Sequence, residues 1–206
     1  MTEYGRLLSA VSFGTVTINV GVFLISPLVP AIAAEFGLGP MAVGLTLGAL
    51  WAAFGLAQYP GGHVADCLSR KTVLVTSLGV FTAGTLLAAS APAYPVFLLG
   101  VATLGLGAGL YPTAAFVQLS ETFVHRRRQA LAINTASINV GGILAGAVAA
   151  GALAVAGWRV ALVPVLGAGI LAVAFMNAWN GNRYDLSGVD LGVRETGSRL
   201  RRSRRL

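Results

Sequence analysis

Cysteine, histidine and charged side chains are scarce in this chain of 206 residues, and each shortage excludes a class of protein. The single cysteine, Cys67, excludes an intramolecular disulfide and a metal site built from several thiolates. Charged residues make up only 10% of the chain, whereas soluble domains contain about 25%. Hydrophobic residues make up 56%, more than a soluble protein of this size could bury. The composition therefore predicts a protein that lies in a lipid bilayer.

Six stretches are apolar over about 20 residues or more, the length that a helix needs to cross a bilayer. Turn signals such as Gly37–Pro40 and Ala91–Pro95 separate these stretches. We therefore expect an all-α membrane protein with six transmembrane helices within residues 1–181, followed by a basic, disordered tail at 182–206. The expected helices lie at about 7–34, 41–64, 72–91, 94–119, 129–156 and 158–179.

The basic residues lie on one side of the membrane if the six spans alternate in direction. That side would hold Arg6, Arg70, Lys71, residues 126–128 and the tail arginines, and the other side only Arg159. Loops rich in arginine and lysine face the cytoplasm. We therefore expect a protein of the cell membrane with both termini in the cytoplasm. The same distribution explains the net charge of +7 without nucleic acid as a partner.

Ionisable side chains are absent from the centres of the predicted spans. A charge there costs about 2.5–3.5 kcal/mol on insertion scales, so their absence is the inexpensive condition. It also leaves no buried acid or base to carry protons. An intramembrane enzyme would need a Ser–His pair or metal ligands within the spans, but His63 and His125 both lie at span ends. We expect no enzymatic activity, no metal and no cofactor.

The gap between the second and third predicted spans contains the most specific motif. It reads Gly-His-Val-Ala-Asp-Cys-Leu-Ser-Arg-Lys over residues 62–71. This segment resembles the signature loop of the major facilitator superfamily of transporters, in which glycine, aspartate and basic residues recur at this spacing. Gly62, Asp66, Arg70 and Lys71 match that pattern, whereas Cys67 and Ser69 replace an arginine and a glycine of the family.

The resemblance implies a mechanical role for this loop. In the family the loop is a latch between two halves of the transporter, and an arginine in it pairs with an acid at the end of the fourth span. Here that pair would be Arg70 and Glu121. The alternative is that Arg70 and Lys71 only set the membrane topology. Three further segments resemble the family, at residues 105–112, 123–130 and 157–159.

The resemblance also implies a fold and a function. Family members contain two six-helix halves, each made of two inverted three-helix repeats, and this chain resembles the N-terminal half. We expect a secondary transporter, or half of one, that moves a small solute by alternating access. The second half would be another chain or another copy of this one. The alternative is a non-transporting remnant of a truncated gene. Val101 and Ala147 stand where proton-coupled members carry arginine and proline, which disfavours proton antiport.

Matching interruptions in the first and fourth spans suggest where a solute would bind. Pro27 and Pro112 both fall late in their spans, and interrupted segments at matching places in inverted repeats indicate a binding site. Polar side chains nearby are the candidates for lining a cavity, although helix–helix hydrogen bonding would also explain each of them. Serine and threonine are not counted, because they can bond to their own backbone. The candidates are Asn19, Tyr111, Gln118, Asn134 and Asn139.

The fifth predicted span carries a pattern of small residues, Gly142 and Gly146, four positions apart. Such a pattern allows two helices to approach closely. In the family this face of the fifth span meets the other half of the transporter. We therefore expect it to be a packing face.

Overall fold

A computed structural model describes the backbone of residues 3–67 and 69–179, with side chains throughout this range except at residues 3 and 59–68. The described part consists of helices, six of which are long and apolar enough to cross a membrane. The six predicted spans are thus confirmed, with ends that differ by a few residues. The predicted tail lies outside the described residues. The elements are α1 (Glu3–Phe36), α2 (Pro40–Cys67), α3 (Arg70–Ala89), α4 (Tyr94–Thr122), η1 (Val124–Arg126), α5 (Arg127–Val155) and α6 (Trp158–Trp179).

Local sequence explains where several helices begin and end. Gly37 and Gly157 have positive φ angles of 63° and 91°, which L side chains rarely adopt, in the turns after α1 and α5. The Ser69 hydroxyl caps α3 by accepting a hydrogen bond from the Thr72 amide at 3.2 Å. A proline, Pro95, stands in the first turn of α4, where its missing amide hydrogen is not needed.

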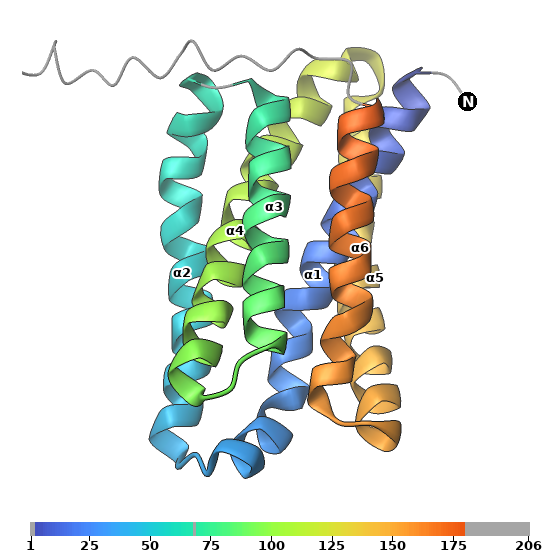
Figure 1. Cartoon of the computed structure of the whole chain (residues 1–206). Coiled ribbons are helices and arrows are strands. Elements are labelled where there is room, and N and C mark those ends of the chain that lie inside the picture. The colour runs from blue at the N-terminus through green and yellow to red at the C-terminus, as the bar shows by residue number, and fades with distance from the viewer. Residues whose placement is uncertain (1–2, 68, 180–206) are drawn as a thin grey trace, which may run out of the picture.

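The helices form one upright bundle (Figure 1). The central helices α1 and α4 each pack closely on two others: α4 on α2 and α3, and α1 on α5 and α6. Helix α3 also packs on α6. If α1, α2 and α3 are exchanged with α4, α5 and α6 in that order, each of these packed pairs becomes a packed pair. An inverted repeat would require this correspondence. That repeat stays a prediction.

The glycine-rich part of α4 allows its neighbours to approach very closely. A Cβ atom on Gly107 would lie 2.3 Å from the backbone nitrogen of Phe81 in α3. On the other side of α4, a Cβ atom on Gly109 would lie 2.1 Å from the backbone oxygen of Phe54 in α2. Real Cβ contacts are never this short, so these glycines explain how α4 fits between two helices.

The expected interruptions at the prolines do not occur. Helix α1 continues through Pro27 and Pro30, and α4 continues through Pro112. Transmembrane helices tolerate proline because neighbouring groups and small local adjustments satisfy the backbone groups that it frees. The prolines therefore do not mark a binding site by breaking their helices.

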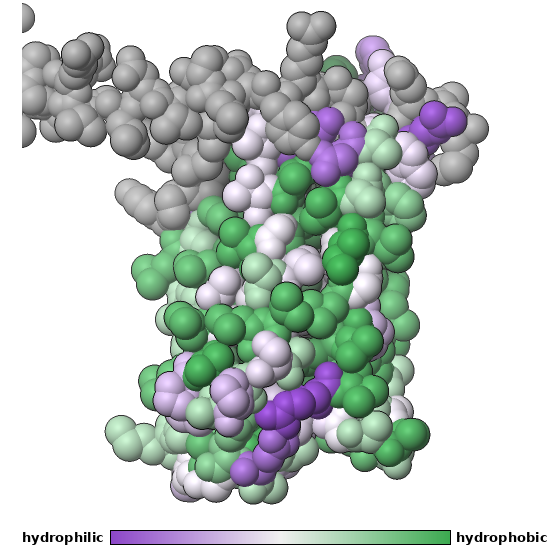
Figure 2. All heavy atoms as spheres, viewed as in Figure 1, coloured by the Kyte–Doolittle hydropathy of each residue, from purple (hydrophilic) through white to green (hydrophobic). Residues whose placement is uncertain are grey.

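The surface of the bundle is apolar along its length and polar at its ends. Figure 2 shows hydrophobic residues over most of the visible side, with hydrophilic residues gathered toward the two ends. The starts of α1, α3 and α5 lie together at one end, with the end of α6 (Figure 1). We call this the basic end, because Arg6, Arg70, Lys71 and Arg126–Arg128 occupy these helix termini. This distribution is that of an integral membrane protein.

Polar contacts tie the helices together at the end opposite the basic end. The Trp158 indole donates a 2.6 Å hydrogen bond to Glu35 Oε2, and Arg159 forms an ion pair with the other carboxylate oxygen. Arg159 also donates to the backbone oxygen of Ala91 at 2.8 Å. The Trp158 ring lies edge-on to Phe97 at 5.3 Å. These contacts join the ends of α1 and α3 and the start of α4 to the start of α6.

Candidate functional site

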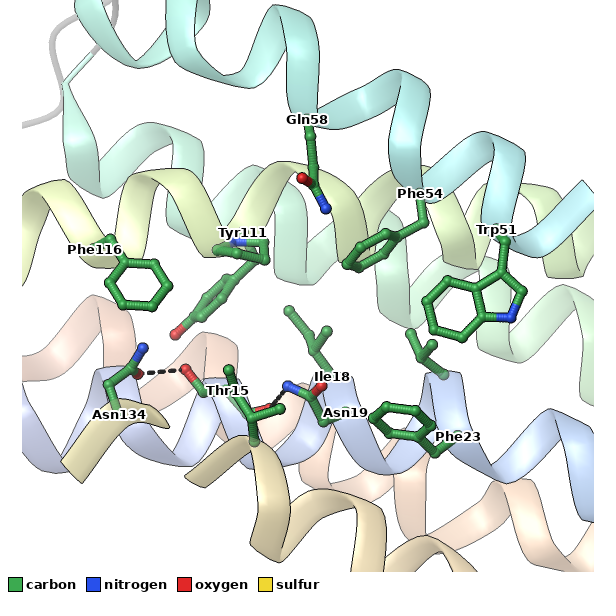
Figure 3. Close-up of a pocket in the computed structure, with 13 residues that line it drawn as sticks. Thr15, Ile18, Asn19, Phe23, Trp51, Phe54, Gln58, Tyr111, Phe116 and Asn134 are labelled. Carbon is green, nitrogen blue, oxygen red and sulfur yellow. Dashed lines mark hydrogen bonds between the residues drawn. The ribbon is translucent and has the colours of Figure 1, made fainter. Parts of the chain in front are cut away.

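A cavity of about 210 Å³ lies between α1, α2, α4 and α5 (Figure 3). Helices α3 and α6 contribute none of its described lining. The lining combines amide and hydroxyl groups with aromatic rings. It consists of Thr15, Ile18, Asn19, Val22, Phe23, Trp51, Phe54, Gln58, Tyr111, Pro112, Phe116, Asn134 and Ile138.

Three of the five polar residues predicted from the sequence, Asn19, Tyr111 and Asn134, line this cavity. The other two do not. Asn139 is exposed on α5, and Gln118 is buried on α4 outside the cavity lining. The Gln118 amide nitrogen lies 3.5 Å from the Thr122 hydroxyl, and its buried oxygen has no hydrogen-bond partner among the described residues. A role in solute binding stays a prediction for all five.

The wall formed by α1 and α5 is held by a short chain of hydrogen bonds. The Thr15 hydroxyl lies 2.7 Å from Asn134 Oδ1 and 3.1 Å from the Val11 carbonyl oxygen. Asn19 Nδ2 donates to the Thr15 carbonyl oxygen at 2.8 Å. Two polar atoms of this wall remain available to a ligand. Within the described structure Asn134 Nδ2 donates no hydrogen bond, and Asn19 Oδ1 accepts none. The wall thus offers one donor and one acceptor.

Tyr111 forms part of the floor between α4 and α1. Its hydroxyl donates a 2.9 Å hydrogen bond to the Val11 carbonyl oxygen, and only 1% of its surface is exposed. It lies against Gly14, where a Cβ atom would come within 2.2 Å of the hydroxyl oxygen. The absence of a side chain at Gly14 therefore creates the space for this ring. Tyr111 joins α1 to α4 beneath the cavity.

Three of the aromatic side chains gather toward one end of the cavity, whereas Phe116 lies at the other end near Asn134 (Figure 3). Phe23 and Phe54 each lie edge-on to Trp51, with ring centroids 6.1 Å and 5.6 Å away. The side chain of Gln58 points into the cavity from α2, facing α1 across it (Figure 3). The cavity therefore has an aromatic end and polar groups on two walls.

Sequence reasoning missed several of these lining residues. Thr15 was set aside because threonines bond to their own helix, yet its hydroxyl reaches both its own helix and Asn134. The aromatic residues on α2 were not singled out, although Trp51, Phe54 and Gln58 recur at intervals of three and four and so share one helix face. That spacing was the available signal.

The predicted latch pair is formed at the basic end. Arg70 Nη2 lies 2.7 Å from Glu121 Oε1, which joins the start of α3 to the end of α4. Lys71 Nζ donates to the Asn177 carbonyl oxygen at 3.2 Å and so ties α3 to α6. The other two predicted members, Gly62 and Asp66, lie in the part of α2 for which only the backbone is described. Whether the pair acts as a latch stays a prediction.

A second cavity, of about 680 Å³, lies at the basic end between α1, the end of α4, η1 and the start of α5. His125 and Arg126 contribute to its lining, with Tyr4 and Thr122. On α1, Tyr4 of the second cavity lies eleven positions from Thr15 of the central one. On α4, Thr122 of the second cavity likewise lies eleven positions from Tyr111 of the central one. Eleven residues bring a helix back to within about 20° of the same direction. The second cavity therefore follows the same faces of α1 and α4 as the central one.

Metal coordination finds no support in the described part of the chain, where no three His, Cys, Asp or Glu residues are grouped closely enough to hold an ion. The polar groups of the central cavity are amides and hydroxyls, which bind organic solutes by hydrogen bonds. Such a lining of apolar rings with a few polar groups is typical of a small-molecule binding site.

Several known transporters share parts of this sequence. A segment of 118 residues is 30% identical to mouse solute carrier family 2, facilitated glucose transporter member 10, and covers 57% of this chain but 22% of that protein. A segment of 99 residues is 32% identical to the multidrug resistance protein MdtL of Klebsiella pneumoniae (strain 342), covering 48% of this chain and 25% of that protein. The matched segments thus span about a quarter or less of these relatives.

Solved structures share the fold. The structure of the proton:xylose symporter XylE bound to 6-bromo-6-deoxy-D-glucose superposes with a TM-score of 0.75 at 16% identity, covering 85% of this chain and 44% of that one. The structure of a bacterial homolog of the human lysosomal transporter Spinster, inward-facing and unoccupied, superposes with a TM-score of 0.77 at 19% identity. That match covers 89% of this chain and 44% of the other. The sequence pattern of the Major Facilitator Superfamily matches residues 11–204. The chain belongs to the Major Facilitator Superfamily.

Proposed function

We propose that this chain forms one half of a secondary transporter, which carries a small solute through the central cavity by alternating access. The observation that supports this most strongly is the position of the cavity. It lies on the side of the bundle formed by α1, α2, α4 and α5, and its polar groups come from all four helices. Transporters of this type bind their solutes at such a place, where two halves of the protein meet.

The flanks of the cavity need a covering partner. Helices α2 and α5 do not pack closely on each other. Only 22% and 17% of an 18-residue apolar stretch in each of them is buried, against 33–50% in the other four helices. Between them lie the amides of Gln58, which is exposed, of Asn19, which is half-buried, and of Asn134, which is buried. Hydrocarbon solvates an amide poorly, so lipid alone is an unfavourable cover for this side. A second six-helix half, from another chain or from another copy of this one, would cover this side with polar groups.

The small residues on α5 fit the same proposal. A Cβ atom on Gly146 would meet nothing within 4 Å, and one on Gly142 would meet only Phe23, at 3.8 Å. The predicted packing face is therefore open in this chain. On α2, Gly48 and Gly55 are equally open. Small residues on both flanking helices would allow a second half to approach closely.

The orientation follows from the charge distribution. We infer that the basic end faces the cytoplasm, because arginine and lysine are retained on that side of the cell membrane. The pair of Arg70 and Glu121 would then lie on the cytoplasmic side, where it would hold α3 against α4 in one state of the transport cycle. No described feature favours a non-transporting remnant over this function.

A solute uptake assay tests the proposal. Cells that express the full chain should accumulate or lose at least one compound from a panel of labelled sugars and dyes, relative to cells without it. Thr15→Val with Asn134→Leu should abolish the difference, because it removes the polar groups that face each other across α1 and α5. Thr103→Val, which removes a hydroxyl that bonds only to the Leu99 carbonyl oxygen of its own helix and lies outside the cavity lining, is the control and should transport normally. A membrane-inserted chain that changes the uptake of no compound would contradict a transporter assembled from copies of this chain alone.

A further inference from the structure

We propose that the central cavity selects uncharged solutes that have an aromatic or apolar face and an amide or hydroxyl edge. This inference rests on the proposed function, since it names the class of solute that the same cavity would bind. It follows from three observations: which polar atoms are left over in the wall, where the rings lie, and what charges the described lining holds.

The polar wall offers neutral hydrogen-bonding groups in a fixed arrangement. Thr15 engages the oxygen of Asn134, which leaves the Asn134 amide nitrogen for a ligand. The Thr15 backbone oxygen engages the nitrogen of Asn19, which leaves the Asn19 oxygen. One wall therefore presents a donor and an acceptor whose partners already fix their orientation. Amide and hydroxyl groups of a ligand can pair with either atom, because each such group both donates and accepts.

The aromatic end supplies the apolar contact. Phe23, Trp51 and Phe54 come from α1 and α2 and meet edge to face. Ring faces and edges of this kind bind apolar or aromatic surfaces. Gln58 points into the cavity from α2 beside Phe54 and faces the polar wall across it (Figure 3), so a solute bound between α1 and α2 would touch both kinds of surface.

The described lining contains no Asp, Glu, Lys, Arg or His. Its one ionisable side chain, Tyr111, is buried, with its hydroxyl bonded to Val11. A charged solute entering this space would lose water without gaining a counter-charge from these residues, which is far more costly than burying a neutral group that is hydrogen-bonded. His125 and Arg126 line the separate cavity at the basic end. They would favour anions there, so an anionic solute is the competing possibility.

Three probes of matched size separate the possibilities: 3-phenylpropionamide, 3-phenylpropionate and 3-phenylpropylammonium. They share one aromatic ring and differ only in an end group that is neutral, anionic or cationic. The purified full chain in phosphatidylcholine nanodiscs would be titrated with each probe while tryptophan fluorescence is recorded. Trp51→Phe removes the one tryptophan in the cavity lining and keeps Trp158 and Trp179, so the signal that depends on Trp51 reports occupancy of the cavity.

The amide should bind at least about tenfold more tightly than either charged probe, a difference of about 1.4 kcal/mol. Gln58→Glu places a carboxylate at an exposed position without removing a hydrogen bond between described residues, and it should shift the preference to the ammonium probe. Equal or tighter binding of a charged probe to the unmodified chain, or no Trp51-dependent binding of the amide, would overturn the inference. Amide-selective binding without solute uptake in cells would instead contradict only the proposed function.

Discussion

The indole of Trp158 and the carboxylate of Glu35 share a 2.6 Å hydrogen bond, which joins the first residue of α6 to the last turn of α1. Arg159 pairs with the same carboxylate. At the basic end, Arg70 is the first residue of α3 and pairs with Glu121 in the last turn of α4. Each end of the bundle thus has an arginine at a helix start bound to a glutamate at a helix end. An exchange of α1 with α4 and of α3 with α6 converts one arrangement into the other.

Glu35→Gln should lower the thermal stability of the chain in detergent. The change removes the charge that serves both Trp158 and Arg159, and we expect a loss of roughly 1 kcal/mol after solvent screening of a half-exposed group. A double-mutant cycle with Arg159→Gln measures the coupling. Strictly additive effects of the two substitutions would show that the pair does not hold α1 to α6.

Gly107→Ala should destabilise the bundle by about 1–3 kcal/mol, because the new methyl group would overlap the backbone of α3. Gly79→Ala is the matched control, since a Cβ atom on this glycine of α3 meets nothing within 4 Å. The control should be neutral, or more stable by up to about 1 kcal/mol through helix propensity. Thermal unfolding of both variants followed by circular dichroism checks this. Equal stabilities would contradict the close contact of α3 and α4.

Glu121→Gln should change transport more than it changes stability. The carboxylate is 58% exposed, so loss of its ion pair with Arg70 should cost less than about 1 kcal/mol. A latch acts by favouring one of two conformations, so its loss should alter the uptake rate of a transported solute. Charge exchange, with Arg70→Glu and Glu121→Arg together, should restore part of that rate. A parallel fall in folded protein and in uptake would indicate a structural role alone.

Reporter fusions test the inferred orientation. A cytoplasm-specific reporter joined after Ser203 should be active, whereas one inserted in the turn at residues 37–40 should be inactive. A reporter that requires export should give the opposite pattern at both sites. Activity of one reporter at both positions would contradict the five membrane crossings, an odd number, that the six-helix arrangement places between the two sites.

Hydropathy predicted the helices well because bilayer thickness imposes a length that six apolar stretches satisfy. The residues that line the cavity were harder to predict, because the lining depends on the direction in which each side chain points. Asn134 and Asn139 were equal candidates, yet five residues turn a helix by about 140°, so both cannot face one cavity. Gln118 shares a face with Tyr111 but lies about 10 Å farther along α4. Helical phase relative to the neighbouring helices decides such cases, and it follows only from the packed bundle.

The tertiary contacts at the helix ends could not be predicted either. Arg159 is the only basic residue on its side in the predicted topology, and the sequence gives no sign that it pairs with Glu35. Their 124-residue separation is bridged because α1 and α6 pack side by side. Hydropathy likewise does not say that α2 and α3 pack against the glycines of α4.

Water access to the cavity is the most direct test of the account. In a Cys67→Ser chain, a single cysteine at Gln58, which lines the cavity, is compared with one at Leu86, an exposed apolar position on α3. Both are treated in cell membranes with a charged, membrane-impermeant thiol reagent. The account predicts rapid reaction at position 58 and none at position 86, because only the first faces a water-filled path between two halves. Lack of reaction at both positions, with labelling by a lipid-soluble maleimide, would show that the cavity side faces lipid and would contradict the account.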